Sequence, residues 1–85
     1  MLQQQLGQRI AVLRKRQRMT QTQLARAVRC SVEFISLMER GVNAPSVARL
    51  EDFAKVLKVR VVDLFKFPRA QPRAVARQRV IRQAQ

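Results

Sequence analysis

Apolar residues near the start of the chain recur at the spacing of an amphipathic helix. Leu6, Ile10 and Leu13 fall at positions i, i+4 and i+7, and Leu2 extends the same stripe by one turn. Side chains at these spacings share one face of a helix, and Gln and Arg fill most of the other positions. The pattern predicts a helix over residues 2–18, after which Met19 turns inward.

Two shorter helices are predicted next, on either side of a turn at Arg29–Ser31. Thr20 and Gln23 have the spacing of a capping box, in which the side chain of each residue accepts a hydrogen bond from the backbone N–H of the other. Ser31 is a suitable cap for the following helix, and Gly41 suits the left-handed conformation that often ends one. Two short helices so close together predict a helix-turn-helix. Their inward faces are predicted to hold Leu24, Ala25 and Val28 in the first helix, and Ile35 and Met38 in the second.

A fourth helix and a short fifth one are predicted after the loop that contains Pro45. Ser46 is a suitable N-cap, and a turn at residues 58–60 separates the fourth helix from the segment Val61–Phe65. No segment alternates apolar and polar residues for long, so no sheet is expected. The chain is therefore predicted to be all-α, with a five-helix domain at residues 1–67. The apolar stripes are Val47, Leu50, Phe53, Ala54 and Leu57 in the fourth helix, and Val61, Leu64 and Phe65 in the fifth.

Basic residues dominate the charge, above all at the two ends of the chain. The 85 residues include 18 Lys and Arg but 5 Asp and Glu, which gives a formal net charge of +13. Residues 1–18 and 66–85 contain no acid. So uneven a charge on a small domain indicates a polyanionic partner, and nucleic acid is favoured over an anionic membrane surface. Residues 68–85 are predicted to be a basic C-terminal arm or a short sixth helix, because their apolar stripe is irregular and a lone helix of this length is marginal in water.

The sequence lacks the residues that most catalytic and metal sites need. It contains no His, and Cys30 is its one cysteine. His/Cys metal sites, an internal disulfide and most nucleophile–base pairs are thereby excluded, and no Gly-rich phosphate loop is present. We therefore expect neither enzyme activity nor a cofactor. No apolar run is long enough to cross a membrane, and the first residues lack the order of a signal peptide, so a cytoplasmic, nucleoid-associated protein is expected.

Several short groups of residues between Leu6 and Phe65 occur at mutually consistent spacings. They are Leu13-Arg14, Thr20-Gln21, Leu24-Ala25, Ile35-Ser36, Glu39-x-Gly41, Pro45-Ser46 and Val61-x-Asp63-Leu64-Phe65. Together they resemble the Cro/phage-repressor type of helix-turn-helix, also called the XRE family, which has a lambda-repressor-like fold.

The resemblance implies a role for many residues of the helix-turn-helix. It implies that Ser31–Met38 is the recognition helix in the major groove and that Arg14 and Glu39 form an internal ion pair. The implied base-facing residues are Val32, Glu33, Ser36 and Leu37. The implied phosphate contacts are Gln21, Ser31, Arg40 and Asn43, to which the charge of Arg29 adds a further one. The side chain of Gln21 is implied to lie against the recognition helix as well.

Two glycine positions of the family carry basic residues in this chain. They are Arg29, in the turn between the two short helices, and Lys58, before the fifth helix. A left-handed Arg or Lys costs roughly 1 kcal/mol, which the fold can absorb.

The predicted recognition helix has an unusual reading face. It lacks Asn, Gln and Arg, the side chains suited to bidentate contacts with adenine or guanine. Glu33 can accept a hydrogen bond from the N4 amine of cytosine, and Val32 and Leu37 can contact thymine methyl groups. Phe34 is either a further apolar contact in the groove or packs against the second helix, which we favour. Direct base reading is thus expected to be sparse, with affinity depending on the many Arg residues.

These features predict a sequence-specific transcription regulator without a sensing domain. We expect a repressor that binds a palindromic operator in double-stranded DNA as a homodimer, since two copies extend the short site that one domain reads. The predicted dimer surface comprises Val61, Val62, Leu64 and Phe65, unless these side chains close the monomer core, with Val75, Val80 and Ile81 as further candidates. Two alternatives stay open: an antitoxin or anti-activator that binds a protein and regulates its own gene through DNA, and a nonspecific nucleoid or RNA-binding protein.

Overall fold

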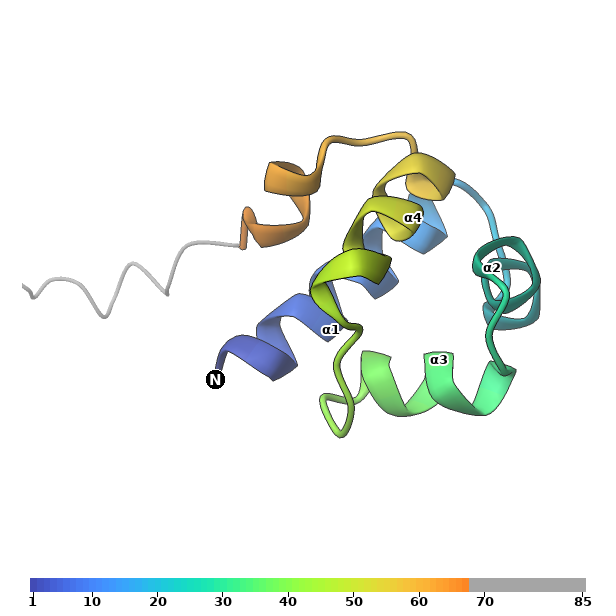
Figure 1. Ribbon diagram of the computed structural model, residues 1–85, viewed down its shortest axis with the longest axis horizontal. Coiled ribbons are helices and arrows are strands. Elements are labelled where there is room, and N and C mark those ends of the chain that lie inside the picture. Colours follow the sequence, from blue (N-terminus) through green and yellow to red (C-terminus); the bar gives the residue numbers. More distant parts are fainter. Residues whose placement is uncertain (68–85) are drawn as a thin grey trace, which may run out of the picture.

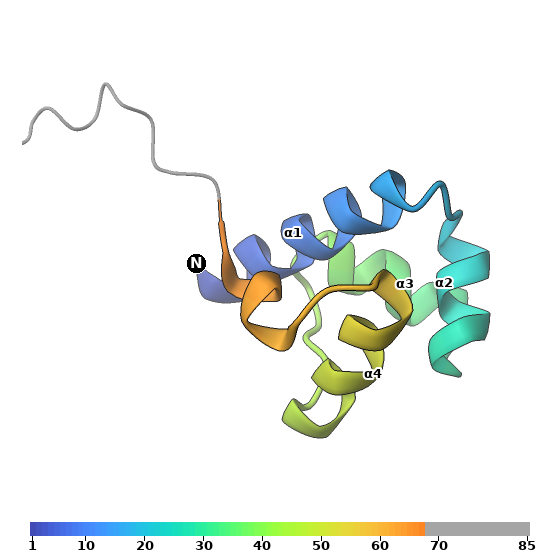
Figure 2. The ribbon, with the colours of Figure 1, turned by 90° about the horizontal axis from the view of Figure 1, so that it is seen from above.

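α1 (Leu2–Arg16) runs along one side of the molecule, and the other elements pack against it or against one another (Figures 1 and 2). They are α2 (Gln21–Val28), α3 (Val32–Glu39), α4 (Val47–Leu57) and a 3-10 helix, η1 (Val61–Phe65). The computed structural model describes residues 1–67, and this part of the chain contains no strand. The all-α prediction is confirmed for these residues, whereas the predicted arm or sixth helix at residues 68–85 lies outside them.

Hydroxyl side chains begin three of the α-helices, as the sequence predicts. Thr20 Oγ1 accepts a hydrogen bond from the N–H of Gln23 at 3.0 Å, and Gln23 Oε1 accepts one from the N–H of Thr20 at 2.8 Å, which completes the capping box. Ser31 and Ser46 cap α3 and α4 through the amide three residues later, at 3.0 and 3.3 Å. These bonds satisfy N–H groups that the first turn of a helix leaves without a partner. Local sequence therefore sets where α2, α3 and α4 begin.

The α-helices end on residues in the left-handed conformation, and most of these residues are basic. Gly41 has a φ of 84°, whereas Arg18, Arg29 and Lys58 have φ values of 58°, 61° and 61°. At each end, the next backbone N–H reaches back five residues to a carbonyl oxygen, at 2.9–3.1 Å. This Schellman pattern satisfies carbonyl groups that the helix leaves free. The left-handed conformations expected at Arg29 and Lys58 are confirmed, and Arg18 adopts a third where the last turn of α1 was predicted.

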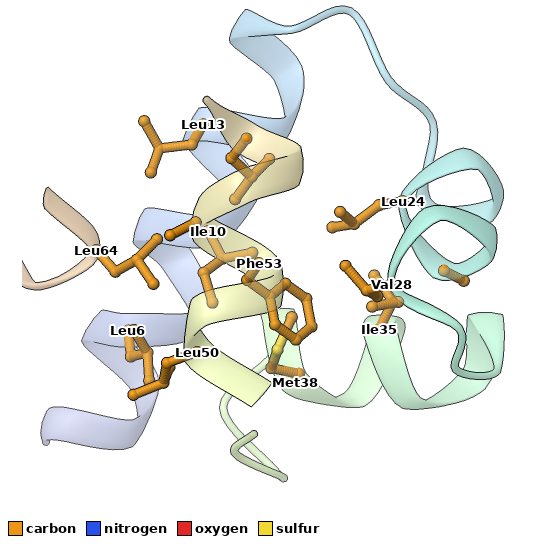
Figure 3. Packing of buried hydrophobic residues seen from close by; sticks show 13 residues of the cluster. Leu6, Ile10, Leu13, Leu24, Val28, Ile35, Met38, Leu50, Phe53 and Leu64 are labelled. Carbon is orange, nitrogen blue, oxygen red and sulfur yellow. The ribbon is translucent and has the colours of Figure 1, made fainter. Parts of the chain in front are cut away.

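Phe53 of α4 lies at the centre of the core, surrounded by side chains from α1, α2 and α3, with Leu64 of η1 beside Ile10 (Figure 3). The partly buried Met19 and Phe34 pack against this core, so the inward orientation predicted for both is confirmed. The buried apolar residues are Leu6, Ile10, Leu13, Leu24, Ala25, Val28, Ile35, Met38, Leu50, Phe53, Ala54, Leu57 and Leu64.

Two residues that the apolar stripes assign to the core are on the surface. Leu2 is 60% exposed and Val47 is 83% exposed. Both lie in the first turn of their helices, at the edge of the core, where no other element of residues 1–67 covers them. The prediction was wrong there because a helical period continues to the end of a helix whether or not a neighbour is present.

The fifth helical segment is a 3-10 helix rather than an α-helix. The N–H of Asp63 donates to the carbonyl of Arg60 at 2.9 Å, and the N–H of Lys66 donates to the carbonyl of Asp63 at 3.3 Å. Both bonds span three residues, and a segment of five residues is too short for an extended ladder of four-residue bonds. Leu64 is fully buried, whereas Val61 and Phe65 stay partly in solvent. The short helix therefore closes the core with one side chain.

Gly7 marks the point where α1 comes closest to α3. A Cβ atom at this position would overlap the carbonyl oxygen of Met38 and lie 3.3 Å from the Cα atom of Glu39. These atoms belong to the backbone, so no rotation of a side chain would relieve the clash. Nearby, Gln3 Nε2 donates a hydrogen bond to the carbonyl of Gly41 at 2.7 Å. The N-terminal half of α1 is thereby held against the end of α3.

The substitution Gly7→Ala should destabilise the fold, although Ala is the better helix former. In an exposed helix this change stabilises by about 0.5–1 kcal/mol. Here the new methyl group pushes α1 away from α3, and overpacking of this kind costs about 1–3 kcal/mol. Urea unfolding of the full chain measures the difference, with Gln8→Ala on the exposed side of α1 as the control. A Gly7→Ala protein as stable as the wild type would contradict the close approach.

The substitutions Arg18→Gly and Lys58→Gly should each stabilise the protein by about 0.5–1 kcal/mol. Glycine has no steric penalty at positive φ, although its greater freedom in the unfolded chain removes part of the gain. Thermal unfolding provides the measurement. Lys55→Gly is the matched control: it removes the same charge from the last turn of α4, where glycine should destabilise by about 1 kcal/mol. If Lys58→Gly destabilised as much as Lys55→Gly, the left-handed conformation would not be strained.

Candidate nucleic-acid interface

α2 and α3 pack against each other at a steep angle and leave one side of α3 open. In Figure 1, α2 is seen nearly end-on while α3 runs across the view. Among the predicted base-reading residues, Val32 and Glu33 are exposed, and Ser36 and Leu37 are partly exposed. α3 thus presents a convex surface, which a major groove is wide enough to admit.

The predicted phosphate-contacting residues include two at each end of α3. Arg29 and Ser31 belong to the turn before it, and Arg40 and Asn43 follow its last residue. The side chains of all but Asn43, which is partly buried, are exposed. Ser31 Oγ already accepts a hydrogen bond from the N–H of Phe34, so its hydroxyl proton is the group left for a phosphate oxygen. Charged and polar donors therefore bracket the open side of α3.

A buried ion pair joins α1 to the end of α3. Arg14 Nε lies 2.7 Å from Glu39 Oε2, and Arg14 Nη2 donates to Glu39 Oε1 at 3.1 Å. The two side chains are 10% and 7% exposed. Arg14 Nη1 also donates to the carbonyl of Met19 at 2.7 Å, which fixes the turn before α2. The internal ion pair that the family resemblance implies is present, in the bidentate geometry that makes such pairs strong.

Gln21, at the start of α2, contributes to the same cluster. Its Nε2 donates to Glu39 Oε1 at 2.9 Å, so one amide proton is directed inward rather than to solvent. The side chain predicted to contact phosphate therefore also holds α2 against α3. Its backbone N–H belongs to the first turn of α2, which leaves such groups without an intrahelical partner. This backbone N–H is a second group through which Gln21 can bind an anion.

Arg49 of α4 holds the turn between α2 and α3 in place, a role that was not predicted from the sequence. Its Nη2 donates to the carbonyl of Val28 and lies 3.5 Å from the carbonyl oxygen of Arg29. A cation at this position also suits the negative end of the α2 dipole. The sequence carries no signal of this role, because Arg49 occupies an ordinary polar position of α4 and only the packing of α4 against α2 brings the groups together.

The structure divides the residues predicted for dimer contact into two groups. Val61, Val62 and Phe65 are 37%, 52% and 38% exposed. Leu64 is fully buried in the core of the monomer, so its assignment to a dimer surface was wrong. Arg9 Nε donates to the carbonyl of Asp63 at 2.9 Å and attaches η1 to α1.

The side chain of Asp63 fixes the start of η1. Its carboxylate lies 2.9 Å from Lys66 Nζ and accepts a hydrogen bond from the N–H of Arg60, also at 2.9 Å. The Lys66 ammonium, followed by this backbone N–H, holds the pKa of Asp63 well below its usual range. The carboxylate therefore stays ionised and in contact with both groups throughout the neutral range.

Residues 1–67 contain no cluster of His, Cys, Asp and Glu side chains able to hold a metal ion. None of the helices in this range is long and apolar enough to span a bilayer.

Comparisons with known proteins agree with this geometry. The sequence model of the helix-turn-helix domain family matches residues 5–65. No curated protein shows a significant match to the chain.

Several solved structures are similar. The clp gene regulator ClgR from Corynebacterium glutamicum is 30% identical with a TM-score of 0.72, and the match covers 75% of this chain and 68% of that one. The restriction-modification controller protein C.AhdI from Aeromonas hydrophila is 26% identical with a TM-score of 0.70, covering 73% and 94%. The master regulator for biofilm formation SinR, in complex with DNA, is 33% identical with a TM-score of 0.65, covering 69% and 95%.

Removing either member of the buried ion pair should destabilise the fold strongly. Glu39→Ala leaves the Arg14 guanidinium buried without its anion, and such a change costs about 3–5 kcal/mol. The double variant Arg14→Met with Glu39→Leu should recover much of that loss, because no charge then stays buried. Urea unfolding of both variants gives the comparison. Asp52→Ala is the control, since it breaks the exposed pair with Arg49 at 3.7 Å, which should be worth less than about 1 kcal/mol. Equal effects of Glu39→Ala and Asp52→Ala would contradict this account.

Proposed function

Since the chain belongs to the XRE type of the helix-turn-helix family of DNA-binding transcription regulators, we propose that it is a repressor that binds a palindromic operator as a homodimer. The family and its solved neighbours are regulators of transcription rather than enzymes.

The open side of α3, bracketed by phosphate-binding groups, carries this proposal. Val32, Glu33, Ser36 and Leu37 are the proposed base-reading residues. Donors at the two ends of a recognition helix can bind the phosphates that border a major groove. Such contacts fix the position of the helix along the DNA. These donors are Arg29 and Ser31 before α3, Arg40 and Asn43 after it, and Gln21 at the start of α2.

The excess of positive charge supports DNA as the partner. With 18 basic and 5 acidic residues, the chain can neutralise many phosphates and release their counterions. Residues 68–85 include further basic residues and no acidic one, and they are proposed to contact the phosphate backbone of the DNA as well.

The position of η1 favours dimerisation that leaves α3 free. η1 and α2 lie at opposite ends of the molecule in both views (Figures 1 and 2). Val61, Val62 and Phe65 are the exposed apolar residues of η1 and form the proposed dimer surface. Two domains joined through η1 would leave both copies of α3 uncovered, as binding to two half-sites requires.

A protein-binding role is the second candidate, in which an antitoxin or anti-activator also regulates its own gene. The observation that favours it is the set of exposed valines on and after α3. Val32, Val42 and Val47 are 45%, 59% and 83% exposed. Exposed apolar side chains suit contact with a protein surface as well as with a groove lined with methyl groups.

Selection of bound duplexes from a random DNA pool by the full chain tests the first candidate. We expect a palindromic motif with half-sites about one helical turn apart. Arg40→Ala should then weaken binding to all sequences alike and reduce the slope of log affinity against log salt by about one. Lys55→Ala removes the same charge from α4 and should leave the slope unchanged. Enrichment of no motif at all would contradict the proposal, and a single half-site would contradict the dimer.

A further inference from the structure

The open side of α3 has an uncommon chemical make-up for a surface that reads DNA. Its residues are Val32, Glu33, Ser36 and Leu37, of which Ser36 is the one with a side-chain hydrogen-bond donor at neutral pH. Glu33 accepts hydrogen bonds and carries a negative charge. The other two side chains are aliphatic. The surface is therefore complementary to a groove that offers a donor and apolar groups, rather than to one lined with acceptors.

The acceptor role of Glu33 narrows the choice of base. In the major groove, guanine presents N7 and O6 and thymine presents O4, all acceptors that repel a carboxylate. Adenine presents its N6 amine beside the acceptor N7, whereas cytosine presents its N4 amine alone. A carboxylate at Glu33 is therefore best matched by cytosine.

The aliphatic neighbours of Glu33 indicate what should lie beside that cytosine. Glu33 and Leu37 are four residues apart and share one row along α3, and Val32 precedes Glu33 at 45% exposure. The N4 amine is attached to C4 of the pyrimidine ring, and the neighbouring C5 position carries the methyl group in thymine and in 5-methylcytosine. A methyl group beside the amine would thus meet Val32 or Leu37 when Glu33 meets the amine.

Because Glu33 carries a negative charge, it requires a hydrogen-bond donor opposite it in the groove. A carboxylate near phosphates is repelled by them, whereas the first turn of α3, where Glu33 lies, is a favourable place for a negative charge because of the helix dipole. The base amines are the donors in the major groove that can offset this repulsion, and cytosine, unlike adenine, presents its amine without an acceptor on the same base. If Glu33 served α3 alone, replacing it would change stability and leave the preferred sequence as it was.

From this complementarity we propose that α3 selects a cytosine bordered by C5-methyl groups, and that methylation of this cytosine at C5 strengthens binding. The inference rests on the proposed function and specifies the class of DNA site. Glu33 accepts from the N4 amine, and Val32 and Leu37 cover the methyl groups of thymine or 5-methylcytosine.

The first test exchanges the acceptor for an amide. Glu33→Gln should change the selected base at one position of each half-site from cytosine to adenine, because Gln pairs bidentately with N6 and N7 of adenine. Glu51→Gln is the matched control: it removes the same charge from an exposed position of α4 and should leave the motif unchanged. Thermal unfolding of both variants separates the loss of a helix-dipole contact from a change in base preference.

The second test changes the methyl groups of the DNA. The selected duplex is the starting point. Each single replacement of a contacted thymine by deoxyuridine should weaken binding about fourfold, which is the effect of one buried methyl group. Replacing the contacted cytosine by 5-methylcytosine should strengthen binding by about the same factor. Val32→Ala or Leu37→Ala should reduce these responses. Val12→Ala, on α1 at 44% exposure against 45% for Val32, should respond like the wild type.

The outcomes distinguish this inference from the proposed function. If no sequence is selected, the proposed function fails. If a motif is selected but Glu33→Gln leaves it unchanged, Glu33 does not read a base and the inference is overturned. Equal affinities for the thymine, deoxyuridine and 5-methylcytosine duplexes would overturn the proposed contacts of Val32 and Leu37 with C5-methyl groups.

Discussion

The ion pair between Arg14 and Glu39 is the interaction on which the arrangement of the helix-turn-helix depends. Through its hydrogen bonds, Arg14 of α1 holds the carbonyl of Met19 before α2 and the carboxylate that ends α3, while Gln21 joins α2 to the same carboxylate. Such a pair is stable in the core only while both charges meet in good geometry. The close approach of α1 to α3 at Gly7 makes this geometry accessible. One cluster thus positions both helices of the candidate interface.

Some of the basic residues that make the chain positively charged lie in a strained backbone conformation. Arg18, Arg29 and Lys58 occupy left-handed positions at helix ends, where glycine would have no steric penalty. A basic side chain there adds to the charge available to phosphates and also suits the negative end of the helix dipole. The strain of about 1 kcal/mol at each position is small compared with the free energy gained by burying the continuous aliphatic core around Phe53. Stability and charge are therefore supplied by different parts of the molecule.

Affinity and specificity are divided in a similar way across the candidate interface. The donors before and after α3 recognise features common to all DNA, so they favour binding without selecting a sequence. Selection is left to a short face on which a carboxylate stands among aliphatic side chains. Such a face discriminates by one acceptor and by methyl contacts, and it penalises bases that present acceptors to Glu33. Arg49 maintains the direction of that face through the turn at Val28 and Arg29.

The starts of α2, α3 and α4, most helix ends and most of the core followed from the sequence, because caps, glycine positions and apolar periods act between residues a few positions apart. Thr20, Ser31 and Ser46 cap their helices as predicted, and the predicted inward faces of α2 and α3 are buried. The ion pair of Arg14 with Glu39 was reached through family resemblance alone. Local pattern wrongly placed Leu2 and Val47 in the core and continued the first helix over the left-handed Arg18. It left Leu64 open between the core and a dimer surface, and it gave no sign of the contact of Arg49 with the turn. These depend on which segments distant in sequence lie against one another, and the packing of α1 and α4 around the helix-turn-helix decides them.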